Sequence, residues 1–146
     1  MDDSELLERA REALDAAYIP YSEYAVGAAL ETADGTVYTG CNIEIANYSN
    51  SLHAEEVALG SAVRDGHREF ERVAVSSAKR DGVTPCGMCR QSFAEFCTEE
   101  FRVICEGDSE GDEGSEGEDE GDAEPVTYRL GDLLPETITR EMVVDE

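Results

Sequence analysis

Two short motifs constrain this chain more than any other feature of its sequence. The first is His53-Ala54-Glu55, and the second, further along the chain, is Pro85-Cys86-Gly87-Met88-Cys89. His53, Cys86 and Cys89 offer one imidazole and two thiolates, a ligand set that suits zinc and leaves the fourth tetrahedral position open for water. An open position indicates a catalytic rather than a structural metal, so the fold has to bring both motifs to one ion.

Glu55 is not needed as a ligand, which leaves its carboxylate free to carry protons beside the metal. Zinc lowers the pKa of a bound water toward neutrality, so hydroxide becomes available at pH 7 to attack an electron-poor carbon. A closed four-ligand site would need a further ligand, and neither His67, Cys97 nor Cys105 has a spacing that recommends it over water. A redox Cys-x-x-Cys pair is the other alternative, but it has no use for the upstream His-x-Glu.

Length and charge limit the class of protein and the kinds of partner. The 146 residues fit a single domain over 1–146 with a true core. A net charge of -24, from 11 basic and 35 acidic residues, excludes nucleic acid and anionic membrane surfaces as partners. Acid excess with Lys79 as the only lysine indicates a halophilic source. Five cysteines, no secretory signal and no long apolar run predict a cytoplasmic protein that does not span a membrane.

The hydrophobic periodicity predicts alternating helices and strands. Ser4 is the expected cap of a first helix, which Pro20 ends. Further helices are expected over 52–64 and 86–97, and strands over 21–30, 37–45, 72–77, 101–105 and 126–130. The turn at 33–35 predicts an antiparallel hairpin, and the order strand, helix, strand over 72–105 predicts a parallel crossover.

Both motifs are expected at helix starts. Asn50 or Ser51 would cap the helix that carries His-x-Glu, and Thr84-Pro85 would cap the helix that carries both cysteines. Backbone N–H groups and the positive end of the helix dipole stabilise thiolates, the form that binds zinc.

Residues 106–124 are almost entirely Gly, Ser, Asp and Glu. Such a tract cannot bury enough apolar surface to offset the entropy of ordering it. We therefore expect a disordered acidic insertion at about 107–123 that solvates the protein. The alternative is an acidic docking or cation-binding segment, although its spacing does not match an EF-hand loop.

The His-x-Glu and Pro-Cys-x-x-Cys pair is the signature of zinc-dependent nucleobase deaminases, and the chain resembles the small cytidine deaminases of the homotetrameric type. Four blocks match in order: Pro20-Tyr21-Ser22 with 26–30, 40–44, 53–55 and 85–91. The resemblance implies a three-layer α/β/α fold with a mixed sheet of about five strands. It also implies deamination of cytidine and deoxycytidine in pyrimidine salvage, with one Zn²⁺ per chain and a homotetrameric assembly.

By the same resemblance, Asn42 and Glu44 would hold ribose hydroxyls, Tyr24 would pack near the nucleoside, and Ala54 would offer its backbone N–H to the base carbonyl. The residues agree with this expectation. Positions i and i+2 of an extended strand point to one side, so Asn42 and Glu44 can grip a diol together. The alternative for that pair is a solvent-facing strand edge.

Arg90 and Gln91 are expected behind the metal ligands, where they donate to the cysteine sulfurs or orient neighbouring groups. The chain departs from the family's usual pattern at Tyr24, at Ile138, where an aromatic that reaches a neighbouring subunit is common, and at His53 with Glu56. Tetrameric members more often have Cys and Arg at the last two positions. Because His for Cys removes one negative charge and Glu for Arg removes a positive one, we interpret the two changes as compensatory.

Two other functions remain open at this stage. One is a relative that deaminates another aminopyrimidine, such as a nucleoside antibiotic or a free base. The other is a zinc-stabilised binding module whose acidic tract recruits basic partners.

Overall fold

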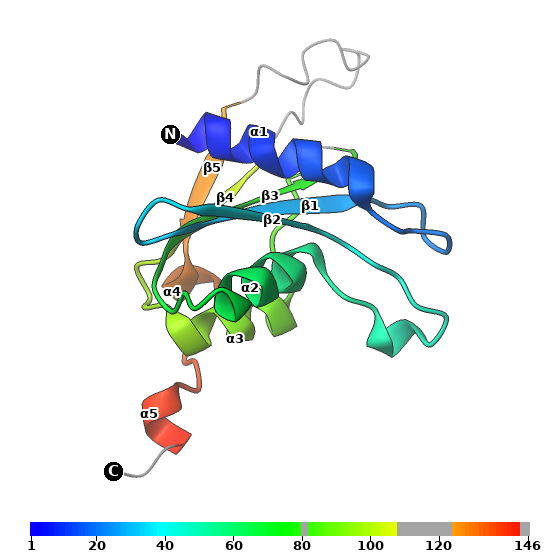
Figure 1. Cartoon of the computed structure of the whole chain (residues 1–146). Coiled ribbons are helices and arrows are strands. Elements are labelled where there is room, and N and C mark those ends of the chain that lie inside the picture. Colours follow the sequence, from blue (N-terminus) through cyan, green and yellow to red (C-terminus); the bar gives the residue numbers. More distant parts are fainter. Residues whose placement is uncertain (80–81, 108–123, 144–146) are drawn as a thin grey trace.

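A computed structural model describes residues 1–79, 82–107 and 124–143 of the chain (Figure 1). One five-stranded sheet has the strand order β2-β1-β3-β4-β5. Its strands are β1 (Val26–Thr32), β2 (Val37–Cys41), β3 (Phe70–Ser77), β4 (Arg102–Cys105) and β5 (Val126–Arg129). β3 and β4 run parallel, whereas the other neighbouring strands are antiparallel. The expected hairpin, crossover and mixed sheet are all confirmed.

Helices cover both faces of this sheet. α1 (Asp3–Ala13) lies on one face, and α2 (Ala54–Arg64) and α3 (Gly87–Phe96) lie side by side on the other, as Figure 1 shows. Two short helices follow, α4 (Leu130–Leu133) and α5 (Arg140–Val143), and α5 stands away from the body of the molecule. The three-layer α/β/α architecture is therefore confirmed.

Alternating side chains of the central strands form two cores. In β1, Ala28 and Leu30 pack toward α2 and α3, whereas Ala29 between them packs toward α1. The larger core also contains Phe93 of α3, and the smaller one is closed by Leu6 of α1. Because strand side chains alternate between faces, apolar residues at every position of a strand indicate that both faces are buried.

Several element boundaries differ from expectation at the N-terminal half. Asp2, not Ser4, caps α1, and its carboxylate accepts the Glu5 backbone N–H at 2.9 Å. β1 begins at residue 26 rather than 21, because Glu23 has a positive φ of 60° that breaks the extended chain. β2 ends at residue 41 rather than 45.

The two helices that carry the motifs begin one or two residues later than expected. Residues 48–50 form a separate 3₁₀ turn, and His53 with its extended backbone is the N-cap of α2 in place of Asn50 or Ser51. Cys86, also extended, caps α3 in place of Thr84. The first residue of each motif pair, His53 and Cys86, therefore lies at the cap itself, and Glu55 and Cys89 lie in the first helical turn.

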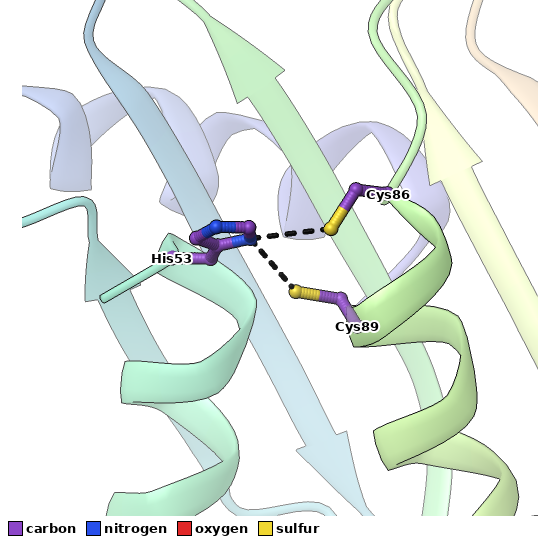
Figure 2. Close-up of side chains that lie close together, drawn as sticks. All are labelled: His53, Cys86 and Cys89. Atoms are coloured by element: carbon purple, nitrogen blue, oxygen red, sulfur yellow. Dashed lines mark hydrogen bonds between the residues drawn. The ribbon is translucent and has the colours of Figure 1, made fainter. Parts of the chain in front are cut away.

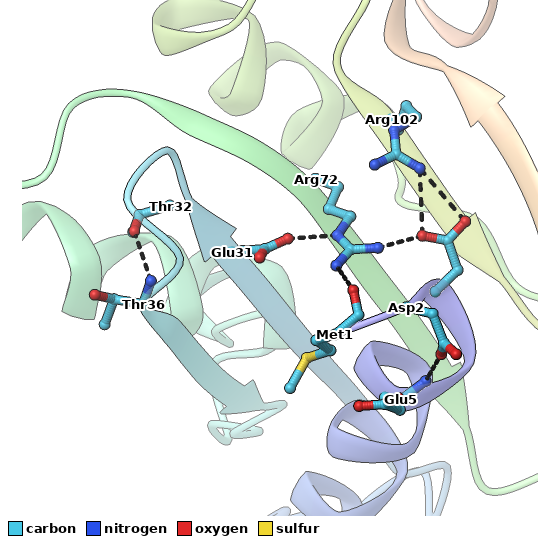
Figure 3. A network of polar contacts seen from close by, with 9 residues as sticks. Met1, Asp2, Glu5, Glu31, Thr32, Thr36, Arg72 and Arg102 are labelled. Atoms are coloured by element: carbon cyan, nitrogen blue, oxygen red, sulfur yellow. Dashed lines mark hydrogen bonds and ion pairs between the residues drawn. The ribbon is translucent and has the colours of Figure 1, made fainter.

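The N-terminus is tied to the first residues of β3 and β4 (Figure 3). Arg72 of β3 donates to the Glu31 and Asp3 carboxylates and to the Met1 carbonyl, and Arg102 of β4 donates to Asp3 at 3.3 Å. Arg72 is only 6% exposed, and its three acceptors satisfy a guanidinium that would otherwise be costly to bury.

The expected acidic insertion lies, apart from Gly107, outside the described residues. Within the described part of the chain, no helix is both long and apolar enough to cross a membrane.

Candidate active site

The starts of α2 and α3 bring one imidazole and two thiols together (Figure 2). His53 Nδ1 lies 3.3 Å from Cys86 Sγ and 3.4 Å from Cys89 Sγ. Among the described residues, this trio is the group of His, Cys, Asp and Glu side chains placed to hold a metal, with all ligand atoms within 4.8 Å of one another. Neither His67, Cys97 nor Cys105 joins it, so the closed four-ligand alternative finds no support in the described chain.

The separations within the trio fit zinc. With Zn–S bonds of about 2.3 Å and Zn–N bonds of about 2.0 Å at a tetrahedral angle, sulfur and nitrogen stand about 3.5 Å apart. Burial and the neighbouring charge of Glu55 raise the pKa of the Cys89 thiol, despite its place in the first turn of α3. A thiolate at this position therefore needs a cation in the cluster, which a zinc ion supplies.

Glu55 lies beside the trio but does not belong to it. The residue is 5% exposed, and burial raises the pKa of its carboxyl. Its place in the first turn of α2, two residues after His53, brings the carboxylate close to the Cys89 sulfur. Burial therefore moves the pKa of this carboxyl in the direction that a group acting as both proton acceptor and proton donor requires.

His53, Cys86 and Glu55 line a cavity of about 340 Å³, large enough for a small ring system. The cavity wall combines the loop before β1, the segment after β2, the start of α2 and the segment before α3. Its lining residues are Ser22, Tyr24, Val26, Asn42, Glu44, Tyr48, Ser51, Leu52, His53, Ala54, Glu55, Val83, Thr84 and Cys86.

Asn42 and Glu44 both line the cavity. They follow the end of β2 and flank Ile43, which forms β-bridges with Tyr18 and Leu52, so the paired, extended backbone expected for these two residues continues beyond β2. Asn42 accepts the Val26 N–H at 3.0 Å and donates to the Tyr24 carbonyl at 2.9 Å. Glu44 is 4% exposed, which rules out the alternative of a solvent-facing edge.

Tyr24 and Ala54 both line the cavity. The Tyr24 ring lies under the Lys79 ammonium, which is 5.7 Å from the ring centroid. Ala54 is the first residue of α2, and N–H groups in a first helical turn lack partners within the helix. A backbone donor therefore lies beside the metal trio.

Arg90 and Gln91 orient neighbouring segments. Arg90 donates to the carbonyls of Pro85 and Leu133, both at 2.6 Å, and to the Thr84 hydroxyl at 3.0 Å. Gln91 donates to the Ile138 carbonyl at 2.9 Å. Of the two expected roles, the contacts of Arg90 match the orientation of neighbouring groups, since two of its acceptors belong to the segment leading into Cys86 and the third is the Leu133 carbonyl.

Some residues of the site were missed by sequence reasoning. Ser22 and Tyr48 line the cavity and contact Glu44, although only the block containing Ser22 was noticed. Glu56, assigned above to a charge effect, accepts the backbone N–H of His53 at 2.9 Å. The signal for Glu56 was the three-residue spacing from His53, which is the spacing of a capping box.

Comparison with known proteins gives a consistent result. Residues 1–105 match the family described as the cytidine and deoxycytidylate deaminase zinc-binding region. A cytidine deaminase of Halalkalibacterium halodurans is 37% identical over 145 residues, 99% of this chain and 100% of that protein. One of Sporosarcina psychrophila is 48% identical over 97 residues, 66% of this chain and 71% of that protein.

The fold agrees with these sequence matches. A crystal structure of cytidine deaminase from Burkholderia pseudomallei superposes with a TM-score of 0.80 at 36% identity, covering 94% of this chain and 100% of that one. Since the family match spans more than half of the chain and includes both motifs, this chain belongs to the cytidine and deoxycytidylate deaminase zinc-binding family.

Proposed function

We propose that this chain is a zinc-dependent enzyme that hydrolyses cytidine and deoxycytidine to uridine and deoxyuridine with release of ammonia. The single observation that carries the proposal is the convergence of His53, Cys86 and Cys89 beside the buried Glu55 at a nucleoside-sized cavity. The matches to curated cytidine deaminases over nearly the whole chain support it.

His53, Cys86 and Cys89 would hold the metal, one Zn²⁺ per chain. When bound, zinc supplies Lewis-acid chemistry that makes water acidic enough to react near neutral pH. Glu55 takes a proton from the water whose oxygen adds to C4 of the base, and passes it to the ring nitrogen N3. The same carboxylate then moves a proton from the added hydroxyl to the amino group. The C4–N bond breaks, and ammonia and the uracil base result.

The polar groups around the cavity orient the nucleoside for this chemistry. Ala54 would donate its backbone N–H to the base carbonyl, and Tyr24 would pack near the nucleoside. Asn42 and Glu44 would receive the sugar hydroxyls. Arg90 and Gln91 act indirectly, since Arg90 holds the segment that leads into Cys86 and Gln91 holds the segment around Ile138.

The decisive experiment measures both the loss of cytidine absorbance and the appearance of ammonia with purified, zinc-loaded protein over a range of salt concentrations. We expect one uridine and one ammonia per cytidine, and loss of turnover after chelation that added zinc restores. If free cytosine or another aminopyrimidine reacts and the nucleosides do not, the alternative substrate class is correct. A protein that binds zinc and releases no ammonia from any of these would be a binding module.

We further propose that the enzyme is a homotetrameric, cytoplasmic, salt-adapted protein of one domain. Assembly is supported by apolar side chains that α5 and the segment before it leave exposed, namely Ile138, Met142 and Val143. Salt adaptation is supported by the net charge of -24. Light scattering in high and low KCl measures the assembly, and a monomer at every salt concentration would contradict the tetramer.

A further inference from the structure

The loop before β1 wraps around a buried carboxylate at the cavity wall. Glu44 Oε1 accepts two backbone N–H groups, those of Tyr21 and Ser22, each at 3.0 Å. Glu44 Oε2 accepts the hydroxyl of Ser22 and, at the longer distance of 3.4 Å, that of Tyr48. One carboxylate therefore organises the whole turn.

The Ser22 hydroxyl has a second partner. While donating to Glu44, its oxygen accepts the backbone N–H of Tyr24 at 3.0 Å. Glu23, between the two, has a φ of 60°, so this hydrogen bond closes a tight turn in the left-handed region. Ser22 thus joins two groups that line the cavity, the Glu44 carboxylate and the backbone that places the Tyr24 ring.

The acceptor capacity of Glu44 differs between its two oxygens. A carboxylate offers about four acceptor positions, two on each oxygen. Both positions of Oε1 are taken by backbone groups at normal distances, whereas one position of Oε2 holds only the long contact with Tyr48. Oε2 is therefore the atom that can take a ligand hydroxyl, by displacing the weak Tyr48 contact.

We propose that Ser22 is a positioning residue that sets the specificity for the sugar: its hydroxyl holds Glu44 so that the remaining acceptor of Oε2 receives a sugar hydroxyl of the nucleoside. This inference rests on the proposed nucleoside deaminase function. It assigns Ser22 no contact with the base, the metal ligands or Glu55. Replacing Ser22 should consequently weaken the binding of a nucleoside that carries sugar hydroxyls and leave the chemical step unchanged.

The test compares cytidine with 2′,3′-dideoxycytidine, which lacks both ring hydroxyls of the sugar. For Ser22→Ala we expect kcat/KM for cytidine to fall about 10-fold, as for loss of a hydrogen bond to a charged group, almost all of it in KM. The value for 2′,3′-dideoxycytidine should change less than about 2-fold, because without the 2′- and 3′-hydroxyls there is no ring hydroxyl for Glu44 Oε2 to receive. Ser22→Thr keeps the hydroxyl at an exposed position, so kcat/KM should equal that of the wild type for both nucleosides.

Ser51→Ala is the matched control. It removes a serine hydroxyl from the same cavity, but Ser51 accepts the Ile45 backbone N–H at 3.0 Å instead of contacting Glu44. Any effect of this variant should be equal for the two nucleosides. Should Ser22→Ala fail to fold by circular dichroism, Ser22→Cys, with a weak donor of similar size, gives the same comparison.

If kcat/KM fell equally for both nucleosides in Ser22→Ala, or did not fall for cytidine, the proposal would be overturned. Ser22 would then only stabilise the conformation of the loop. In both cases the wild type still deaminates cytidine, so the proposed function stands. A wild type that deaminates neither nucleoside removes the proposed function, and the inference about Ser22 with it.

Discussion

Gly40 of β2 sets how closely α2, with His53 and Glu55 at its start, approaches the sheet. A Cβ at this position would collide with the Ala54 carbonyl oxygen and lie 2.6 Å from the Ala58 nitrogen. Ordinary contacts begin at 3.4 Å, so Gly40→Ala has to move the helix backbone by about 0.8 Å or more. Both clashing atoms belong to backbone, which cannot rotate away as a side chain can.

We expect Gly40→Ala to lower the free energy of unfolding by about 1–3 kcal/mol, the usual effect of overpacking. The larger effect should be on turnover. A displacement of roughly 1 Å in a catalytic constellation can lower the rate about 100-fold. We therefore predict a kcat about 100-fold below wild type for folded, zinc-containing protein, measured by cytidine absorbance with the zinc content and urea midpoint determined on the same samples.

Two glycines provide matched controls for this prediction. A Cβ at Gly27 would collide with the Ala10 carbonyl of α1, on the face of the sheet that carries no site residue. Gly27→Ala should destabilise the protein similarly and change kcat by less than about 3-fold. Gly60 lies inside α2 with nothing near its Cβ position, so Gly60→Ala should raise the free energy of unfolding by about 0.5–1 kcal/mol through the higher helix propensity of alanine. Normal turnover in Gly40→Ala, or an equal loss in Gly27→Ala, would refute the reasoning.

Three further predictions concern charged side chains. Arg11→Ala should lower the free energy of unfolding, measured by urea denaturation, by about 3–5 kcal/mol, because the buried Glu106 carboxylate loses its guanidinium partner at 2.7 Å. Glu8→Ala removes only the exposed partner of Arg11 and should change the free energy of unfolding by less than about 1 kcal/mol. In Arg90→Lys the ammonium cannot donate to the three acceptors that the planar guanidinium holds, two of which lie in the segment leading into the zinc ligand Cys86. Zinc affinity, measured by chelator competition, should therefore fall about 10–100-fold. Hydrogen bonds from Thr32 and Thr36 lower the pKa of Asp34 from 3.8, its ordinary value, to about 2 in the folded protein. The ionised Asp34 therefore stabilises the fold fully above pH 3.8, and this stabilisation is lost as the pH falls through the folded pKa of about 2. The melting curves of wild type and Asp34→Asn should therefore differ at pH 6 and converge near pH 2.

The layers of the fold and the metal trio could be predicted from sequence because each rests on a local pattern. Alternation of strand and helix periods predicts the crossover, and the spacing of His53, Cys86 and Cys89 predicts the ligand set. The starts of α2 and α3 were placed too early, because a residue with an extended backbone can cap a helix without a favoured capping side chain.

Contacts between segments distant in sequence could not be predicted. The wrapping of the loop before β1 around Glu44 depends on the end of β2 and the positive φ of Glu23, and no local pattern in the sequence reports either. The close approach of α2 at Gly40 is similar, since a glycine in a strand indicates a nearby backbone without saying which one. Both features are formed only when the tertiary structure assembles.

The most direct test of the central claim is the Glu55→Gln variant, assayed for zinc content and cytidine turnover in the same preparation. Glutamine preserves the shape of the buried side chain and cannot carry a proton. We predict one zinc per chain, as in the wild type, with turnover lower by about 10²–10⁴-fold. Turnover near that of the wild type would contradict the role of Glu55, and loss of zinc would place this residue among the metal ligands instead.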